Sequence, residues 1–446
     1  MRRSRQSCAA IAIVLLALSG ARADVVPGDL VTAANREQVR GLVPDELYPY
    51  VIENFDGLEM QIVEPGAYPP HPKFVEATVK YACQASVDAQ GNLVGYTAGQ
   101  PFPYSEWAKE ATGHRCDLSP DDPQFGIKLA WNVNYRWQRA GNNYPHWGFS
   151  YMRNGGKDLW RLGQGEYRRT YFSHRADLLP ETHKLEEDTV VEWAEFFEVK
   201  DPFDLRGTMF LLFRYTDPEK EDDTWAYVPS LRRVRRVATT QKSDSLLGTE
   251  FSLEDFALFS GYVRDQIWEF KGESVLLAQM NSQRRCFPLT LGDDVATRTT
   301  GMKRLGDRKE WGACEFGPWG ALPFAGERWE KRTLFQLDDV PRQKGHPYSR
   351  KMLWYDKETM IPKYAITFDR AGNPYKIMAT IHAWSEDLDN PANHGAQVPV
   401  EVGNTIVNLQ SNNSHVIQMY NGNVATFSVR DSRKYFDTTR LKKRGR

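Results

Sequence analysis

Between residues 192 and 389, short apolar runs alternate with turn residues, a pattern typical of β-strands. The runs predict strands over 192–199, 207–215, 224–228, 231–237, 266–271, 274–280, 328–337, 351–355, 363–369 and 375–384. The pairs Lys271-Gly272 and Gly372-Asn373 stand where tight hairpin turns would join neighbouring strands. We therefore expect a mostly antiparallel β body.

Several predicted strands are apolar on both faces. In 207–215, Met209 and Leu211 point to one face, and Phe210 and Leu212 point to the other. A sheet with one face in water would carry polar residues at every second position. Two arrangements explain the pattern. The sheet is covered on both sides by the long N-terminal segment and by helices, or it is a curved, half-closed barrel whose concave face lines an apolar cavity.

The region before the β body is different in character. Residues 24–125 are punctuated by Pro, Gly and Asn, which favour loops, and one helix is predicted over 32–41. A second helix is predicted inside the strand series, because Ser252 and Asp255 have the spacing of a capping box. We expect this second helix to cover one end of the sheet.

The C-terminal region adds two predicted strands, 404–409 and 416–420, followed by a tail rich in Lys and Arg. Such a tail is usually exposed to water and has no binding role. A binding site is the alternative. The predicted organisation is a signal peptide 1–23, a loop-rich covering segment 24–125, an antiparallel β body 126–389 and a C-terminal region 390–446.

The first 23 residues have the features of a secretory signal. Three arginines precede the apolar run 9–18, and Ala21-Arg22-Ala23 ends in an A-x-A pattern. We expect cleavage before Asp24, with a retained signal anchor as the alternative. The apolar run is too short to span a bilayer comfortably, and no later run approaches the roughly 20 residues that a spanning helix needs. The sequence therefore predicts an exported chain that does not cross a membrane.

Composition and charge narrow the class of protein further. Of 446 residues, 41% are apolar and 26% are charged, which is enough to build a sizeable core. Lys and Arg number 57 against 58 Asp and Glu, so the net charge of −1 offers no basic footprint for nucleic acid. Aromatic residues make up 12% of the chain, and this content suits strands or an aromatic-lined cavity.

Four cysteines remain once the signal is removed: Cys83, Cys116, Cys286 and Cys314. An even number in an exported chain predicts disulfides, although three connectivities are possible. The two local pairings would each close a loop of about 30 residues. Zinc binding is the alternative, but the chain has no C-x-x-C motif.

Motifs that would carry catalysis are not found in the sequence. There is no G-x-S-x-G, no phosphate-binding loop ending in G-K-[ST] and no H-E-x-x-H. The nine His are scattered, and paired acids such as Asp338-Asp339 lie in turn-like sequence. We therefore predict a protein that is not an enzyme and that needs neither a metal nor a cofactor.

The most unusual local feature is a cluster of four arginines, Arg232, Arg233, Arg235 and Arg236. Four acidic residues lie just upstream and could neutralise it: Glu219, Glu221, Asp222 and Asp223. Such an exposed, mutually paired hairpin is one interpretation. The other is a docking surface for an acidic membrane-protein partner or for anionic lipid headgroups.

Several motifs resemble a known family. WAYVPSLRRVRR at 225–236, followed by DSLLG at 244–248 and FSLED at 251–255, resembles outer-membrane lipoprotein-sorting proteins of the LolA/LolB type. Three other stretches resemble an exported Gram-negative family that carries only a domain-of-unknown-function label. These are VGYTAGQPFP at 94–103, GIKLAWN at 126–132 with Tyr135-Arg136, and HPYSRK at 346–351 with WYDK at 354–357.

The resemblance implies a mainly β (α+β) fold, a half-open antiparallel LolA-like β-barrel with covering helices. It also implies a periplasmic location, an apolar cavity that shields lipid, and a setting beside RND-type membrane transporters. A glycan-binding or glycan-processing envelope protein is the alternative, because 13 Trp could stack on sugar rings. From alternation on the predicted strands, the candidates for the cavity wall are Trp193, Phe197, Met209, Leu211, Phe213, Trp225, Trp268, Tyr364, Ile366, Ile377 and Ile381.

Overall fold

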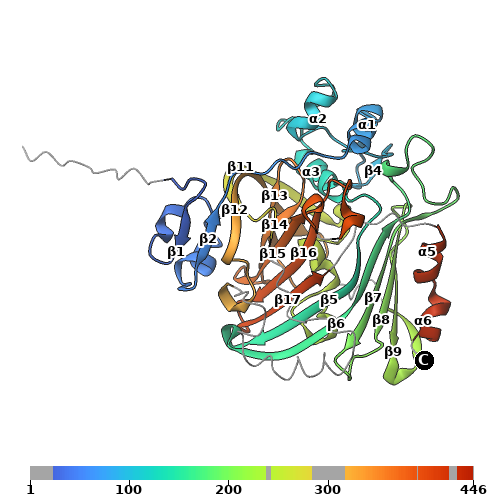
Figure 1. Ribbon diagram of the computed structural model, residues 1–446. Coiled ribbons are helices and arrows are strands. Elements are labelled where there is room, and N and C mark those ends of the chain that lie inside the picture. Colours follow the sequence, from blue (N-terminus) through green and yellow to red (C-terminus); the bar gives the residue numbers. More distant parts are fainter. Residues whose placement is uncertain (1–23, 238–242, 284–316, 389, 421–428, 445–446) are drawn as a thin grey trace, which may run out of the picture.

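The computed structural model describes residues 24–237, 243–283, 317–388, 390–420 and 429–444 (Figure 1). The strands are β1 (Leu30–Thr32), β2 (Glu59–Ile62), β3 (Ser86–Val87), β4 (Leu93–Val94), β5 (Asn143–Arg153), β6 (Asp158–Tyr171), β7 (Val191–Asp201), β8 (Met209–Tyr215), β9 (Asp223–Val228), β10 (Arg233–Val237), β11 (Gln266–Ala278), β12 (Ala325–Pro341), β13 (Arg350–Asp356), β14 (Pro362–Phe368), β15 (Pro374–Trp384), β16 (Pro399–Asn408) and β17 (Asn413–Tyr420). The α-helices are α1 (Pro72–Lys80), α2 (Glu106–Ala111), α3 (Phe125–Asn134), α5 (Val429–Tyr435) and α6 (Thr438–Arg444).

Nearly all strands belong to one large, curved sheet (Figure 1). Its antiparallel part runs in the order β11, β12, β13, β14, β15, β16, β17, β5, β6, β7, β8, β9 and β10. Strand β2 joins β12 in parallel and carries β1 on its other side, so the sheet is mixed. Within the described strands β10 does not pair with β11, and the sheet is not closed into a barrel. The fold is therefore mainly β, as predicted.

Both faces of the central strands are buried, and this explains their two-sided apolar pattern. On β13, Met352 and Trp354 join one core cluster, whereas Leu353 and Tyr355 join another. We call the face that carries Leu353 and Tyr355 the inner face, and the opposite one the outer face. The same alternation continues on β14, where Ala365 is an inner-face residue.

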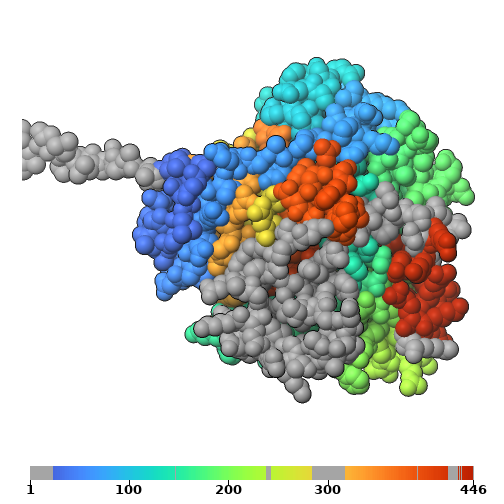
Figure 2. All heavy atoms as spheres, viewed as in Figure 1, coloured from blue at the N-terminus to red at the C-terminus, as the bar shows by residue number. Residues whose placement is uncertain are grey.

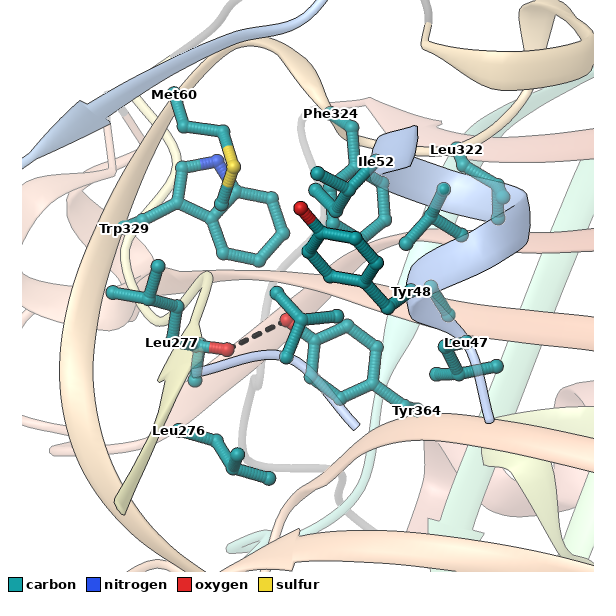
Figure 3. Packing of buried hydrophobic residues seen from close by; sticks show 14 of the residues in the cluster. Leu47, Tyr48, Ile52, Met60, Leu276, Leu277, Leu322, Phe324, Trp329 and Tyr364 are labelled. Carbon is teal, nitrogen blue, oxygen red and sulfur yellow. Dashed lines mark hydrogen bonds between the residues drawn. The ribbon is translucent and has the colours of Figure 1, made fainter. Parts of the chain in front are cut away.

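The N-terminal segment covers the outer face of the central strands. Leu47, Tyr48, Ile52 and Met60 pack in one core with Trp329 and Tyr364 and with residues of β11 (Figure 3). The hydroxyl of Tyr364 donates to the carbonyl of Leu277 at 2.6 Å, which satisfies the polar atom inside this core. This packing matches the first of the two arrangements considered for the apolar strands.

The inner face is covered by α3 and by a short 3₁₀ helix, η8 (Leu253–Leu258). The predicted capping box is present there, since the side chains of Ser252 and Asp255 both bond to the helix start. Asp255 also accepts hydrogen bonds from Lys351 Nζ at 3.2 Å and from the Tyr348 hydroxyl. Burial alone would raise the pKa of Asp255, but Lys351 and Lys376 lower it overall. An ionised Asp255 thus fixes η8 to the inner face of the sheet, rather than to its end.

The C-terminal helices cover the outer face of β7 to β9. Leu441 of α6 packs with Phe196, Met209, Leu211 and Tyr227. Figure 2 shows these helices, coloured dark red, on the surface beside β9. The C-terminal end of the chain is therefore part of the packed structure up to Arg444, whose guanidinium pairs with Glu198 and Glu166.

Two local predictions differ from the structure. The hairpin predicted at Lys271-Gly272 is wrong, because 266–271 and 274–280 belong to one strand, β11, which pairs with β12 along its whole length. Gly272 has a φ of +120° and lies at a bulge, which bends the strand without reversing it. The helix predicted over 32–41 is reduced to a 3₁₀ turn, Arg36–Val39. By contrast, the turn at Gly372-Asn373 joins β14 and β15 as an antiparallel pair, as predicted.

Within the described residues, none of the helices has both the length and the apolar character needed to cross a membrane.

Candidate functional site

An apolar pocket lies on the inner face between β17, β5, β6 and β7 and the segment that leads into η8. The space between its lining residues, with the open solvent at its mouth included, is about 470 Å³. The sheet contributes Trp147, Phe149, Tyr151, Trp160, Arg161, Phe197, His415 and Ile417, and the covering side contributes Leu205, Leu246, Leu247, Thr249, Phe251 and Phe256. Most of these side chains are hydrocarbon or aromatic, so the pocket is suited to an apolar ligand.

Two glycines of β6 shape the floor of the apolar pocket. Gly163 pairs with Phe149 and Gly165 pairs with Trp147 across the two strands. A Cβ atom on Gly163 would come within 2.1 Å of the Phe149 ring, and one on Gly165 within 2.6 Å of the Trp147 ring. The glycines therefore leave room for the two aromatic rings to lie over the neighbouring strand.

A middle pocket of about 350 Å³ adjoins the apolar pocket and shares Phe197, Leu246 and Phe256 with it. Phe210 and Leu212 of β8 line its floor. Its one carboxylate among the described lining residues is Glu195, which accepts hydrogen bonds at 2.6 Å from the Tyr167 hydroxyl and from Arg169 Nε. The middle pocket is thus mostly apolar, and its carboxylate is already hydrogen-bonded.

A third space of about 510 Å³, the arginine pocket, follows on the same face. Trp193 lies between two of its guanidinium groups, with Arg169 and Arg214 at 4.4 and 4.6 Å from its ring centroid. Arg214 pairs with the buried Asp222 at 3.0 Å. Arg136 of the loop after α3 also lines this pocket. The apolar, middle and arginine pockets together form what we call the inner-face groove.

His415 lies buried in the apolar pocket, in edge-to-face contact with Phe149, Tyr151 and Phe251. Neither ring nitrogen has a hydrogen-bond partner within the described residues. Burial lowers the pKa of His415 to about 3, so the ring is neutral at physiological pH. The pocket therefore contains a neutral polar group within an aromatic wall.

Three of the eleven residues predicted for the cavity wall line the groove: Trp193, Phe197 and Trp268. The other eight lie on the outer face instead. The C-terminal helices pack against four of them: Met209, Leu211, Phe213 and Trp225. Tyr364, Ile366 and Ile377 pack beneath the N-terminal segment, and Ile381 continues their side of β15. Alternation separates the two faces of a strand correctly, but it does not tell which face is covered by packed chain and which one lines a pocket.

Strands β5 and β6, which supply most of the floor, were not predicted from the sequence. The signal was present, since Trp147, Phe149 and Tyr151 alternate with smaller residues at the period of a strand. Gly163 and Gly165 contributed to the omission, because glycine lowers strand propensity. Here their lack of a side chain is what makes room for the aromatic floor.

The predicted docking arginines form an exposed strand at the end of the sheet. Arg232, Arg233 and Arg235 are exposed and make no ion pair within the described residues. Arg236 pairs with Asp223. Of the upstream acids, Asp222 pairs with the buried Arg214 and Glu219 with Arg264. Within the described residues, Arg236 is thus the member of the arginine cluster that forms an ion pair with one of these acids.

Cys83 and Cys116 form a disulfide across a separation of 33 residues. This is one of the local pairings considered from the sequence. Cys286 and Cys314 lie outside the described residues, as does the predicted signal peptide 1–23. No group of three or more His, Cys, Asp or Glu in the described part of the chain is placed to hold a metal ion.

The fold and the groove together define a mainly β protein whose open, curved sheet carries a row of pockets on one face. Residues 30–442 match the family described as "Protein of unknown function (DUF1329)". The chain belongs to this family, and the resemblance to a domain-of-unknown-function family is confirmed. A search among curated proteins gives no match.

Several solved structures are similar to this chain, including the following three. One, assigned to an outer membrane lipoprotein-sorting protein domain of Vibrio parahaemolyticus, has 17% identity and a TM-score of 0.46 over 72% of this chain and 99% of the other. A DUF1329 family protein from Desulfovibrio piger has 17% identity and a TM-score of 0.43 over 71% and 95%. A LolA superfamily protein from Nitrosomonas europaea has 13% identity and a TM-score of 0.35 over 69% and 94%.

Proposed function

We propose that this protein binds a lipid or another elongated hydrophobic molecule in the inner-face groove, and holds or transfers it in the periplasm. The observation that carries the proposal is the apolar pocket, with its floor of Trp147, Phe149 and Ile417 and its cover of Leu246 and Phe256. On the outer face beneath the N-terminal segment, by contrast, buried side chains pack together in one cluster.

Burial of ligand surface would supply the affinity. A hydrocarbon chain that buries roughly 300 Å² of apolar surface gains about 7 kcal/mol at 25 cal/mol per Å², before the entropy losses of association. Since a Kd of 1 μM corresponds to about 8 kcal/mol after these losses, such burial alone supports binding weaker than micromolar, and a longer chain or polar contacts would raise the affinity. The groove is therefore suited to binding that is reversible, which a transfer protein requires.

The proposal includes a docking role for the arginine cluster, with an RND-type inner-membrane transporter as the partner. Arg232, Arg233 and Arg235 support it, because they are exposed and make no ion pair within the described residues. Lys442 and Lys443 of α6 are exposed as well, and α6 contacts β10. This edge of the molecule suits an acidic partner surface.

The glycan alternative receives less support from the groove. Sugar hydrolysis needs two carboxyl groups that face a common site. Among the described residues that line the apolar and middle pockets, Glu195 is the one carboxylate, and it is held by Tyr167 and Arg169.

The proposal is tested with two neighbouring leucines on opposite faces of β8. Leu212 lines the middle pocket, whereas Leu211 is fully buried beneath the C-terminal helices. Leu212→Glu should fold, because its carboxylate can be hydrated in an empty pocket, and it should lose binding of a fluorescent fatty-acid probe. Leu211→Glu should fail to fold, because it buries an unpaired charge in packed core.

If Leu212→Glu does not fold, a second variant can still test whether the pockets bind the probe. Leu246 lines both the apolar and the middle pocket, so Leu246→Trp fills the space they share without adding charge. Leu231→Trp, at a position that is 47% exposed, is the matched control. Probe binding should fall at least tenfold in Leu246→Trp and stay unchanged in the control. Equal binding by both variants would contradict the proposed site.

A further inference from the structure

Arg136 differs from the other charged residues of the inner-face groove. It lines the arginine pocket, yet within the described residues no carboxylate lies at ion-pair distance from its guanidinium. Its Nη1 donates to the carbonyl of Val133 at 2.9 Å, and Glu401 attracts it from farther away. Burial lowers the pKa of Arg136. A partly buried guanidinium therefore lines the pocket without an ion pair within the described residues.

The other two arginines of the pocket are already neutralised. Arg169 pairs with Glu195, and Arg214 pairs with Asp222. Arg136 is repelled by Arg169 and attracted by Glu401, which lies beyond ion-pair distance. A partly buried guanidinium without an ion pair can offer its charge and its N–H donors to a bound anion.

Further hydrogen-bond donors line the same space. These are Asn134, Gln138 and Tyr355, and their side chains make no hydrogen bond to another described residue. Together with a guanidinium, amide and hydroxyl donors form the usual environment of a bound carboxylate or phosphate. The pocket thus offers several donors and a charge to one anionic group.

The arginine pocket lies in line with the middle and apolar pockets along β7. Trp193, Glu195 and Phe197 occupy successive inner-face positions of β7, and they line the arginine, middle and apolar pockets in that order. Four residues of a strand span roughly 13 Å. An anionic site and an apolar site therefore lie in a row along one strand, as the head and tail of an amphiphile require.

We propose that the ligand is an anionic amphiphile whose carboxylate or phosphate headgroup lies in the arginine pocket with Arg136 as its counter-ion. The hydrocarbon chain runs past the Arg169–Glu195 pair into the middle and apolar pockets. This inference rests on the proposed function and specifies its ligand class.

The test compares three ligands with the same twelve-carbon chain and different headgroups: dodecanoate, dodecyl phosphate and dodecanol. Each is used at pH 8 to displace the neutral fluorescent probe N-phenyl-1-naphthylamine from the full chain. The wild type should bind at least one of the anions about tenfold or more tightly than dodecanol. Preference for dodecanoate points to fatty acids, and preference for dodecyl phosphate points to phosphate-bearing lipids.

Arg136→Gln is the critical variant, and Arg235→Gln, at an exposed position, is its control. Arg136→Gln should lose the preference for anions while its affinity for dodecanol stays within about twofold of the wild type. Its Tm should stay within a few degrees of the wild type, because Arg136 is only partly buried and makes no ion pair within the described residues. The control variant should bind each of the three ligands with the same affinity as the wild type.

The possible failures are distinguishable. If the wild type binds the three ligands equally, or if Arg136→Gln keeps the preference, the headgroup site is overturned while hydrophobic binding stands. If Arg136→Gln melts many degrees lower and loses all three ligands, Arg136 is a structural residue and the inference is overturned. If no ligand displaces the probe from the wild type, the proposed function fails as well.

Discussion

The ring of Phe149 lies so close to Gly163 of the neighbouring strand that a Cβ atom there would come within 2.1 Å of a ring carbon. The two residues are directly paired in the register of β5 and β6. The absence of one side chain therefore determines where an aromatic ring of the groove floor lies. This relationship connects the sequence to the shape of the proposed binding site.

Replacing Gly163 with Ala should displace Phe149 and destabilise the protein by about 1–3 kcal/mol, the usual range for overpacking. Gly403→Ala is the matched control, because its Cβ would meet the flexible end of Ile381 at 3.2 Å. We expect the control to change the free energy of unfolding by less than about 1 kcal/mol. Urea unfolding of both variants checks this, and equal losses would show that the aromatic contact does not constrain Gly163.

The disulfide between Cys83 and Cys116 should contribute about 3 kcal/mol, since it closes a loop of 33 residues in the unfolded chain. The double variant Cys83→Ser/Cys116→Ser should therefore unfold at a clearly lower urea concentration than the wild type. Peptide mapping of the unreduced protein should recover the two cysteines in one linked fragment. Alkylation of either thiol without prior reduction would contradict the pairing.

The arginine cluster should matter little for folding. Replacing Arg232, Arg233, Arg235 and Arg236 with Gln removes one surface ion pair, Arg236 with Asp223, and exposed pairs contribute about 0–1 kcal/mol. Calorimetry should show a Tm shift of only a few degrees. A collapse of stability would mean that these guanidinium groups hold the sheet edge together, which would remove the support for a docking surface.

His415 should make the protein sensitive to acid. Its pKa is lowered to about 3 in the folded state by burial, whereas the unfolded chain binds the proton near pH 6.5. Stability is therefore lost as the pH falls from about 6.5 toward 3. Between pH 7.5 and pH 5, the wild type should lose about 2 kcal/mol more than His415→Leu in urea unfolding. A constant difference between the two proteins across this range would contradict a neutral, buried ring.

The sequence predicted most of the sheet because its strands alternate and end at turn residues. The prediction for 363–369 matches β14 (Pro362–Phe368) within one residue at each end. The strand prediction failed where pairing with a distant strand overrides the local preference for a turn. Lys271-Gly272 has the composition of a hairpin, yet β12 is long enough to pair with both halves of β11, and Gly272 becomes a bulge.

The groove was harder to predict than the sheet. Leu211 and Leu212 are equally apolar in sequence, but one is buried by α6 and the other lines the middle pocket. That difference depends on which distant segment packs on each face, and one sequence does not carry this information. Arg136 was visible only as part of a family motif, because its lack of a carboxylate partner is a property of the folded chain.

Native mass spectrometry of the protein, purified from the periplasm without detergent, tests the central claim most directly. Wild-type protein should carry a small hydrophobic molecule that organic extraction releases, and Leu246→Trp should carry markedly less of it. Wild-type protein that shows only the mass of the bare chain, and that takes up no lipid from added vesicles, would contradict a ligand-binding groove on the inner face.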